Sequence, residues 1–392
     1  MDNFDSKHHL TTIGLTNFRN DNQPINIKDS DRLQHIYVIG KSGTGKSTLL
    51  KHMALSDIHK GKGLCIIDPH GDLSKDLIQN IPQARVKDLI YLNPSNKDHI
   101  IPFNPLKHIH PSYHHLVAGG LVSTLKKIWS ESWGARMEHI LRFTLLTLLN
   151  YPTATLLDIQ PILTNQDFRN HVLTYKHPKE IQHFWNNEFN KYTPKQRSEY
   201  IAPILNKVGI LSASTPLKNT FVTNTNTLKL NKVMDNSKIL ICNLSKGTLG
   251  EDASTILGSI LTTSIQLTAL YRATIPEHQR VPFYLYIDEA HSFITQSITD
   301  ILAEARKYKL SLFLAHQYLD QLQEPNRKAI FGNVGTIISF RIGATDAEYL
   351  AKEFYPTFKE TDFIHLPKFH FYIKLMIDGE MSEGFSGKTI QA

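Results

Sequence analysis

The sequence predicts an α/β fold in which a mostly parallel sheet is interrupted by an all-helical segment. A glycine-rich loop, Gly40–Ser47, connects an apolar run of strand length to a helical pattern. Further apolar runs alternate with helical patterns in the second half of the chain, as is typical of parallel sheets. Between about residues 112 and 225 valine is scarce, and apolar residues recur at helical spacing instead.

The loop Gly40–Ser47 matches the phosphate-binding pattern G-x-x-x-x-G-K-[ST]. A β-rich run, His35–Ile39, precedes the loop, and a helical pattern follows it up to Gly61. Glycines allow close backbone approach to phosphate oxygens, and a helix start adds partial positive charge. An ordinary glycine turn is the weaker alternative, because every motif position matches in the right context. The residues expected to bind the nucleotide are Lys41, Ser42, Gly43, Thr44, Gly45, Lys46, Ser47 and Thr48.

Within this set, two side chains have specific expected roles. Lys46 would contact the β- and γ-phosphates, and the Ser47 hydroxyl would bind Mg²⁺.

A second apolar strand, Phe283–Ile287, ends in the adjacent carboxylates Asp288 and Glu289. Open α/β sheets bind ligands at the carboxyl ends of their strands. We therefore expect Asp288 to hold Mg²⁺, directly or through a water, and Glu289 to orient and polarise an attacking water. A helix-capping Asp-Glu pair is the alternative. A kinase would not need Glu289, since its acceptor is a substrate hydroxyl, so the pair favours a hydrolase.

A third apolar run, Leu310–Ala315, is followed by Gln317. After a phosphate loop and an Asp-Glu strand, Gln317 is expected to sense the γ-phosphate, although alone it would be a solvated loop residue. The preceding stretch, Ile301–Tyr308, reads as helical and contains Arg306. Arg306 either complements the dipole at a helix end or reaches into a neighbouring subunit's site as an arginine finger.

These patterns divide the chain into four expected parts. Residues 1–34 form an arm or short edge strands, 35–111 and 226–392 form the two parts of a nucleotide-binding domain, and 112–225 form an all-helical insertion. Asp68 follows a strand, where it either assists the metal site or forms a turn with Pro69. We prefer the turn. The other expected strands are Gly63–Ile67, Asp88–Leu92, Lys238–Leu244, Thr336–Ile342 and a C-terminal pair near Phe369–Asp378.

Composition bounds the class of protein. The chain has 392 residues, 41% of them apolar, enough for one large or two modest domains. No uninterrupted apolar stretch approaches the ~18 residues of a membrane span, and the N-terminus lacks a signal-peptide core. Cys65 and Cys242 lie in strand-like runs and read as buried thiols of a reduced protein. We expect a soluble, cytoplasmic chain with no transmembrane segment of its own.

The net charge of +7 suits a polyanionic partner but is weak support alone. Most of this excess lies in the expected helical insertion, where bases such as Lys126 and Lys127 could line a DNA entrance. Its aromatic residues could stack on bases, although a role in the helical core is the more frequent one.

Five segments carry a family resemblance. They are DPHGDL (68–73), SWGARMEHILR (132–142), YLYIDEAHSF (284–293), ARKYKLSLFLAHQYLDQL (305–322) and NVGTIISFRIGATDAEYLAKEF (333–354). They resemble the FtsK/HerA superfamily, and within it most of all the cytosolic ATPase domain of conjugative type IV secretion coupling proteins. The likeness extends from about Gly14 to Ser386.

The resemblance implies a RecA-like motor with an inserted helical domain, which forms a hexameric ring and pumps DNA with ATP and Mg²⁺. By position, the nucleotide-site residues of the family are matched by Lys46, Ser47, Asp288, Glu289 and Gln317. Arg306, eleven residues before Gln317, matches the position of a trans-acting arginine, and Arg341 is a second candidate.

Coupling proteins usually carry a membrane anchor, and HerA-type translocases carry an N-terminal barrel. Neither is seen in the residues before the phosphate loop. The resemblance to a motor is unaffected by this difference, whereas a membrane-docked secretion pathway has less support. The partners that the resemblance implies are DNA, further copies of this chain in a homo-hexamer, and a membrane-bound secretion channel or relaxosome proteins. The alternatives are a HerA-type DNA-processing translocase outside secretion, and an ATPase that energises secretion without binding DNA.

Overall fold

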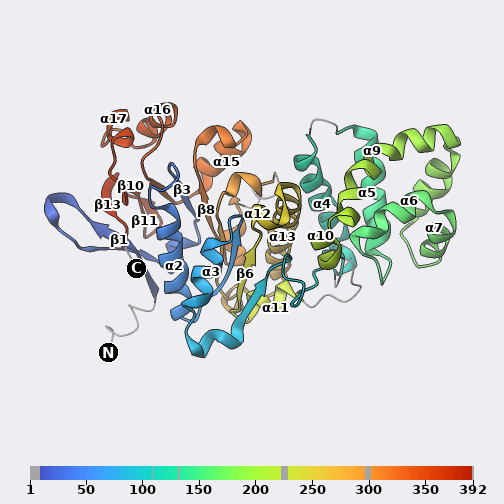
Figure 1. Cartoon of the computed structure of the whole chain (residues 1–392), viewed down its shortest axis with the longest axis horizontal. Coiled ribbons are helices and arrows are strands. Elements are labelled where there is room, and N and C mark those ends of the chain that lie inside the picture. The colour runs from blue at the N-terminus through green and yellow to red at the C-terminus, as the bar shows by residue number, and fades with distance from the viewer. Residues whose placement is uncertain (1–8, 108, 131–132, 222–227, 296–301, 391–392) are drawn as a thin grey trace.

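The computed structural model describes residues 9–107, 109–130, 133–221, 228–295 and 302–390. Within these residues, a large mixed sheet occupies one end of an elongated molecule, and helices occupy the other (Figure 1). The eleven strands of this sheet are ordered β2-β1-β13-β10-β9-β3-β8-β7-β4-β6-β5. Their bounds are β1 Leu10–Thr16, β2 Pro24–Lys28, β3 Ile36–Ile39, β4 Gly63–Asp68, β5 Leu89–Leu92, β6 Ile239–Asn243, β7 Phe283–Ile287, β8 Leu310–His316, β9 Thr336–Ser339, β10 His370–Lys374 and β13 Phe385–Lys388.

The strands from β9 to β5 are all parallel. Every residue of β3, β4, β6, β7 and β8 is buried, because helices cover both faces of this part of the sheet. Strands buried on both faces need continuous apolar runs, which is why they were visible in the sequence. The predicted α/β fold with a mostly parallel sheet is confirmed.

The remaining strands form an antiparallel extension: β10 pairs with β9 and β13, and β1 pairs with β13 and β2. The edge strands expected in residues 1–34 are therefore present. The expected strand pair near Phe369–Asp378 is wrong in its pairing. Met376–Ile377 (β11) leaves the large sheet and pairs with Glu380–Met381 (β12). Asp378 and Gly379 between them both have positive φ, the conformation of a tight hairpin turn.

Strand β9 ends at Ser339, three residues before the expected end at Ile342. The chain leaves the ladder there, and the amide of Ile342 donates instead to the carbonyl of Phe363. Arg341 consequently lies beyond the strand. Of the expected helix Ile301–Tyr308, Leu302 is helical, residues 303–304 form a turn and Ala305–Tyr308 form a short 3-10 helix; Ile301 lies outside the described residues.

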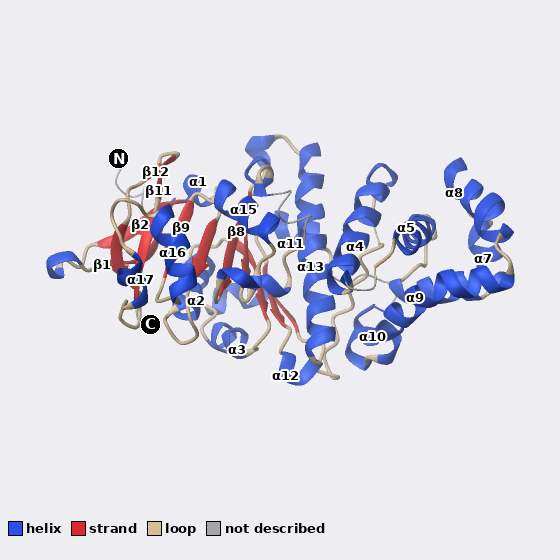
Figure 2. Ribbon diagram, turned by 90° about the horizontal axis from the view of Figure 1, so that it is seen from above, coloured by secondary structure: helices blue, strands red, loops and turns tan. Residues whose placement is uncertain are grey.

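Helices lie on both faces of the sheet (Figure 2). On one face are α2 (Lys46–His59) and α3 (Asp72–Gln79); on the other are α13 (Glu251–Tyr271), α15 (Glu324–Asn333) and α16 (Ala344–Glu353). By length and composition, the segment Glu251–Thr274 containing α13 is apolar enough to cross a membrane. In the structure, 72% of its most apolar window is buried, as in a core helix.

The described residues between 112 and 221 contain no strand and form α4–α10. The bounds of these helices are α4 His114–Ile128, α5 Ala135–Leu149, α6 Ile159–Thr164, α7 Gln166–Leu173, α8 Lys179–His183, α9 Pro194–Ala213 and α10 Thr215–Phe221. Helix α4 packs on α13, where the Thr124 and Thr263 hydroxyls lie 2.9 Å apart. One continuous apolar core joins this helical region to the sheet. The domain boundaries stay a prediction, and residue 225 lies outside the described residues.

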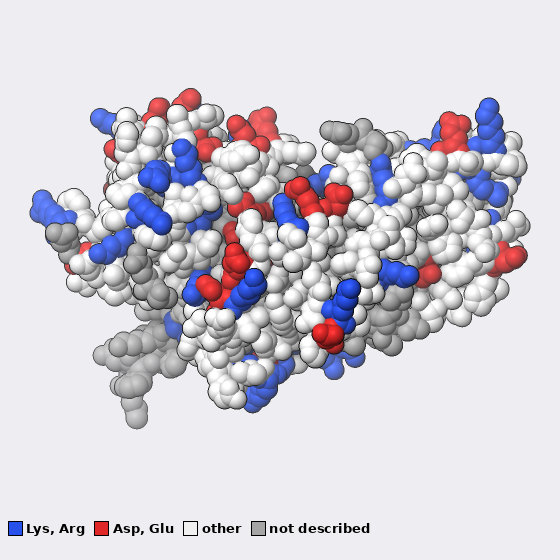
Figure 3. Space-filling view, viewed as in Figure 1, with Lys and Arg blue, Asp and Glu red and all other residues white. Residues whose placement is uncertain are grey.

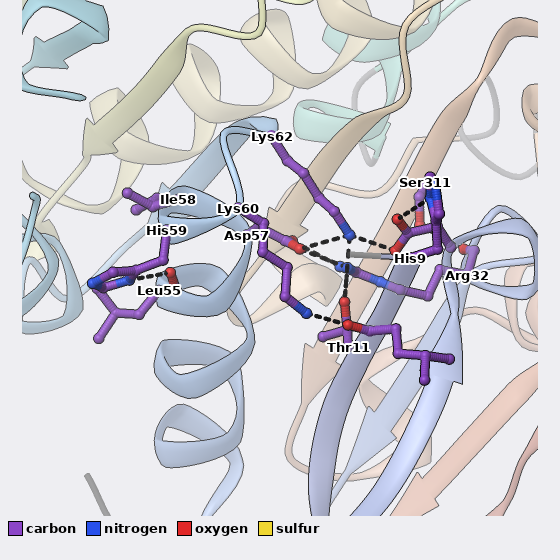
Figure 4. Close-up of polar contacts among 12 residues, drawn as sticks. His9, Thr11, Arg32, Leu55, Asp57, Ile58, His59, Lys60, Lys62 and Ser311 are labelled. Atoms are coloured by element: carbon purple, nitrogen blue, oxygen red, sulfur yellow. Dashed lines mark hydrogen bonds and ion pairs between the residues drawn. The ribbon is translucent and has the colours of Figure 1, made fainter. Parts of the chain in front are cut away.

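A buried ion pair ties the N-terminal strands to the centre of the sheet (Figure 4). Arg32 donates from Nη1 and Nη2 to the two carboxylate oxygens of Asp57 on α2, at 2.6 and 2.8 Å. The Tyr286 hydroxyl of β7 donates to the same carboxylate at 2.5 Å, and Thr11 of β1 accepts from Arg32 at 2.9 Å. Burial alone would raise the pKa of Asp57, but Arg32 holds it below its usual value.

Candidate active site

The phosphate loop lies between β3 and α2, at the carboxyl edge of the parallel strands. Two of its glycines have positive φ, +72° at Gly43 and +127° at Gly45. A Cβ at Gly45 would lie 2.9 Å from the ring of Phe340 and 3.2 Å from that of Phe369. Only glycine fits this backbone and this close approach, so the loop can keep its amides free to face an anion.

Lys46 begins α2 and is almost fully buried. Its Nζ donates to the carbonyls of Gly40 and Lys41, at 2.5 and 3.2 Å, so the ammonium folds back over the loop. Burial lowers its pKa, while Glu289 and Asp288 act in the opposite direction. The lysine is thus placed where the negative charge of a phosphate would stabilise its charged form.

Ser47 and Asp288 line one cavity of about 380 Å³, together with Thr48 and His70. The Asp288 side chain is buried, and its pKa is raised to about 6 by burial and then by Glu289 and Asp68. A hydroxyl and a carboxylate are hard oxygen ligands of the kind that Mg²⁺ prefers. A cation would also relieve the crowding of carboxylates here, so the residues present fit the ion.

Within the described part of the chain, no group of three or more His, Cys, Asp or Glu side chains could hold a metal by itself. Mg²⁺ typically keeps waters and phosphate oxygens as ligands beside one or two protein groups. This site therefore fits a metal that arrives with a nucleotide.

Asp68 has a structural role. Its Oδ1 accepts from the amides of His70 and Gly71, both at 2.9 Å, and its Oδ2 accepts from the amide of Ser74 at 2.8 Å. Both oxygens are therefore occupied in forming the turn into α3. These contacts fit the preferred interpretation of Asp68 as a turn residue, while its charge still raises the pKa of Asp288.

Glu289 directly follows β7 in a left-handed conformation, with φ 47° and ψ 50°. Its Oε1 accepts from Nε2 of Gln317 at 2.7 Å, and Nε2 of His70 lies 3.9 Å from the same oxygen. Burial would raise the pKa of Glu289, but His70 and the shorter bond from Gln317 lower it to about 2. Glu289 is thus ionised at neutral pH.

Gln317 reaches Glu289 because of the order of the strands. The phosphate loop follows β3, Gln317 follows β8, and Glu289 follows β7, and these are neighbours in the sheet. Gln321 fixes the turn after β8, since its Oε1 accepts from the amides of Gln317 and Tyr318 at 3.0 and 3.2 Å. Side chains from three separate parts of the sequence therefore converge at one edge.

The two candidate arginines occupy different places. Arg306 is exposed and precedes β8, whereas Gln317 follows it, so the whole strand of roughly 20 Å separates Arg306 from the site. Arg341 is also exposed but lies beside the phosphate loop, since its carbonyl accepts from the amide of Lys41 at 2.8 Å. Arg341 is thus near the nucleotide site of its own chain, and Arg306 is not.

Sequence reasoning missed two residues around Glu289. His70 was visible as part of the turn after β4, but only Asp68 was considered there. His291 directly follows the Asp-Glu pair, and its Nδ1 lies 3.4 Å from Oε2 of Glu289. A signal was available for both, since each histidine lies within three residues of an acidic strand end.

The paired lysines of α4 are not two equivalent surface charges. Lys126 is exposed and forms an ion pair with Glu138 at 3.1 Å. Lys127 instead donates to the carbonyl of His291 at 2.9 Å, and burial lowers its pKa to about 7. That both lysines line a DNA entrance stays a prediction, and the structure shows that Lys127 is half-buried and already bonded to a carbonyl. On the face shown in Figure 3, basic and acidic side chains are interspersed rather than gathered in one patch.

A phosphate loop, two adjacent carboxylates and a glutamine, converging at the carboxyl edge of a parallel sheet, define an ATPase of the RecA-like α/β class. The particular family follows from comparison with known proteins. The model described as the central domain of the helicase HerA matches residues 13–265, and the chain belongs to this family. A second model, the TraM recognition site of TraD and TraG, matches residues 282–354.

Solved structures share the fold. The bacterial conjugative coupling protein TrwBdeltaN70 is similar with a TM-score of 0.70 and 16% identity, over 94% of this chain and 87% of the TrwBdeltaN70 chain. TrwB in complex with ADP and Mg²⁺ has a TM-score of 0.67 and 15% identity, over 93% and 87%. VirB4 of Thermoanaerobacter pseudethanolicus has a TM-score of 0.64 and 15% identity, over 97% and 96%. The comparison with curated proteins gave no match. The resemblance stated from the sequence is confirmed.

Proposed function

We propose that this chain is an ATP-driven DNA translocase that moves DNA in conjugative transfer or type IV secretion. The proposal rests mainly on one observation: the phosphate loop, Glu289 and Gln317 converge in a fold that is shared with a conjugative coupling protein. The match to the TraM recognition site of TraD and TraG supports the same process.

In this proposal, Mg·ATP lies at the carboxyl edge of the sheet. The loop residues Lys41 to Thr48 hold the phosphates, with Lys46 supplying the charge, and Ser47 and Asp288 hold Mg²⁺. Bound Mg²⁺ would neutralise charge on the phosphate oxygens. TrwB in complex with ADP and Mg²⁺ supports the choice of cofactors.

Glu289 orients the attacking water. Its ionised carboxylate accepts hydrogen bonds, and Gln317 fixes one of its oxygens by the 2.7 Å bond. The other oxygen, Oε2, is buried and has no hydrogen-bond partner among the described residues, so it keeps the capacity to accept a hydrogen bond from a water that enters with the nucleotide. Gln317 would report whether the γ-phosphate is present, because it follows β8 at the nucleotide edge of the sheet and its side-chain amide donates to the Glu289 carboxylate.

Arg306 would act on the site of a neighbouring subunit. It cannot reach its own nucleotide across the length of β8, whereas an exposed position at the opposite edge is accessible to another copy. Arg341, beside its own phosphate loop, would act in its own subunit or support the loop. A ring, which we propose to be a hexamer, would bring Arg306 to the next site.

We expect the protein to work in the cytoplasm, at the inner membrane through a secretion channel or relaxosome proteins. The second candidate is a HerA-type translocase that processes DNA outside secretion, favoured by the family match over residues 13–265. A secretion channel that co-purifies with the chain would support the first, and a nuclease the second.

The test is ATP turnover with and without DNA, for wild type, Lys46→Ala and Glu289→Gln. We expect DNA to stimulate the wild type, Lys46→Ala to lose nucleotide binding, and Glu289→Gln to bind ATP but turn over at least 100-fold more slowly. Equal turnover in all three proteins would refute the site. Wild-type turnover that DNA does not change would instead favour an ATPase that energises secretion without gripping DNA.

A further inference from the structure

We propose that Lys127 and His291 are positioning residues that link the helical region to Glu289. Lys127 lies in the last turn of α4, the first helix of this region, and within the described residues its ammonium donates to the His291 carbonyl alone. His291 stands two residues after Glu289 and faces its free carboxylate oxygen. This inference rests on the proposed function and adds that the helical region responds to DNA.

The segment after Glu289 is wedged between the sheet and the helices. Phe293 and Ile294 are fully buried. Phe293 fits against α13 only because residue 258 is glycine: a Cβ there would lie 2.3 Å from its ring. A segment held this tightly moves as a unit with the helices that pack on it.

Lys127 makes this segment sensitive to α4. An ammonium group has three donors, and the half-buried ammonium of Lys127 has a single carbonyl partner; burial lowers its pKa to about 7. Because α4 also packs on α13, a shift of α4 moves the ammonium and its carbonyl partner together. A displacement of α4 is therefore transmitted through this hydrogen bond to the backbone of His291.

His291 lies between Glu289 and Gln321. Its Nδ1 lies 3.4 Å from Oε2 of Glu289 without forming a hydrogen bond, and its Nε2 lies 3.4 Å from Nε2 of Gln321. Gln321 in turn holds the amide of Gln317. A displacement of a few tenths of an ångström decides whether His291 holds Oε2 or leaves it free for water.

The test compares Lys127→Met with the matched control Lys126→Met, which removes the same charge from the exposed neighbour. ATP turnover is measured at saturating DNA, and hydrogen exchange of the amides from 289 to 295 is measured without DNA. We expect the ratio of kcat with DNA to kcat without DNA to be at least fivefold smaller in Lys127→Met than in the wild type, with KM for ATP unchanged. The amides from 289 to 295 should exchange faster in this variant. Lys127→Arg, which keeps a donor and a charge, should restore part of the stimulation.

Three outcomes would overturn the link. One is unchanged stimulation and unchanged exchange in Lys127→Met. Another is a loss of DNA affinity in Lys127→Met together with a weaker dependence of that affinity on salt concentration, which would make Lys127 a contact to DNA phosphate. The third is an equal loss of stimulation in Lys126→Met. If DNA does not stimulate the wild type, the proposed function fails, and the exchange comparison alone then decides the link.

Discussion

Asp288→Asn is expected to stabilise the protein in the absence of nucleotide and Mg²⁺. Burial and two neighbouring carboxylates raise the pKa of Asp288 from 3.8 to about 6. A shift of this size corresponds to about 3 kcal/mol of unfavourable free energy for the ionised form in the folded state. Asparagine has the same shape, removes the charge and keeps an oxygen to accept from the Glu289 amide, which lies 3.0 Å away.

The pH dependence follows from the sign of the shift. A raised pKa means that the folded state binds the proton more tightly, so Asp288 costs nothing below about pH 4. The cost then grows as the pH rises through 6. The variant and the wild type should thus be equally stable near pH 4, and the variant should be about 1–3 kcal/mol more stable at pH 7.5.

The assay is urea unfolding at pH 4, 6 and 7.5 in EDTA. The control is Asp72→Asn, which neutralises an exposed carboxylate lining the same cavity. Addition of Mg·ATP should stabilise the wild type more than the variant, because the variant loses a proposed metal ligand. A wild type that is as stable as Asp288→Asn at pH 7.5 without ligand would refute the reasoning.

Three further predictions concern the core, the contact between Glu289 and Gln317, and the phosphate loop. Asp57→Asn leaves the buried Arg32 without its counter-charge and should cost about 3–5 kcal/mol in denaturant unfolding; a loss below about 1 kcal/mol would contradict it. Gln317→Ala removes the bond that lowers the pKa of Glu289, so kcat should fall at least tenfold and the acid limb of its pH profile should move upward; an unmoved limb counts against the pairing. Gly45→Ala forces a side chain into a φ of +127°, and binding of a fluorescent ATP analogue should weaken at least tenfold while circular dichroism is retained; wild-type affinity would show that the loop tolerates a Cβ.

The parallel half of the sheet could be predicted because its strands are buried on both faces. Ile36–Ile39 and Phe283–Ile287 are continuous apolar runs, and a run of this kind needs no knowledge of its neighbours. The short pair β11 and β12 was missed, since a two-residue strand carries almost no periodicity. The early end of β9 was missed because Phe340–Ile342 is apolar enough to resemble strand.

The sequence predicts those features of the site that depend only on the type of a residue and on its position after a strand. Lys46, Asp288 and Gln317 are all at the carboxyl edge, as expected for residues that follow parallel strands. The contact between Gln317 and Glu289 could not be predicted, because it depends on the order of strands in the sheet. The link from Lys127 to His291 joins positions 164 apart and has no local signal at all.

The position of β13 sets the time at which the N-terminal strands can join the sheet. Their neighbour is β13, which pairs Lys388 with Leu15 and Gly387 with Thr16, so more than 370 positions separate the paired segments. At roughly 5–20 residues per second, a ribosome needs about 20–75 s to make the intervening chain. During that interval β1 can pair with β2 but not with β13, and a two-stranded hairpin with an open edge is marginally stable and prone to pair with other chains. A chaperone that covers this hairpin during synthesis would therefore improve the yield of the folded ATPase more than one that acts after release.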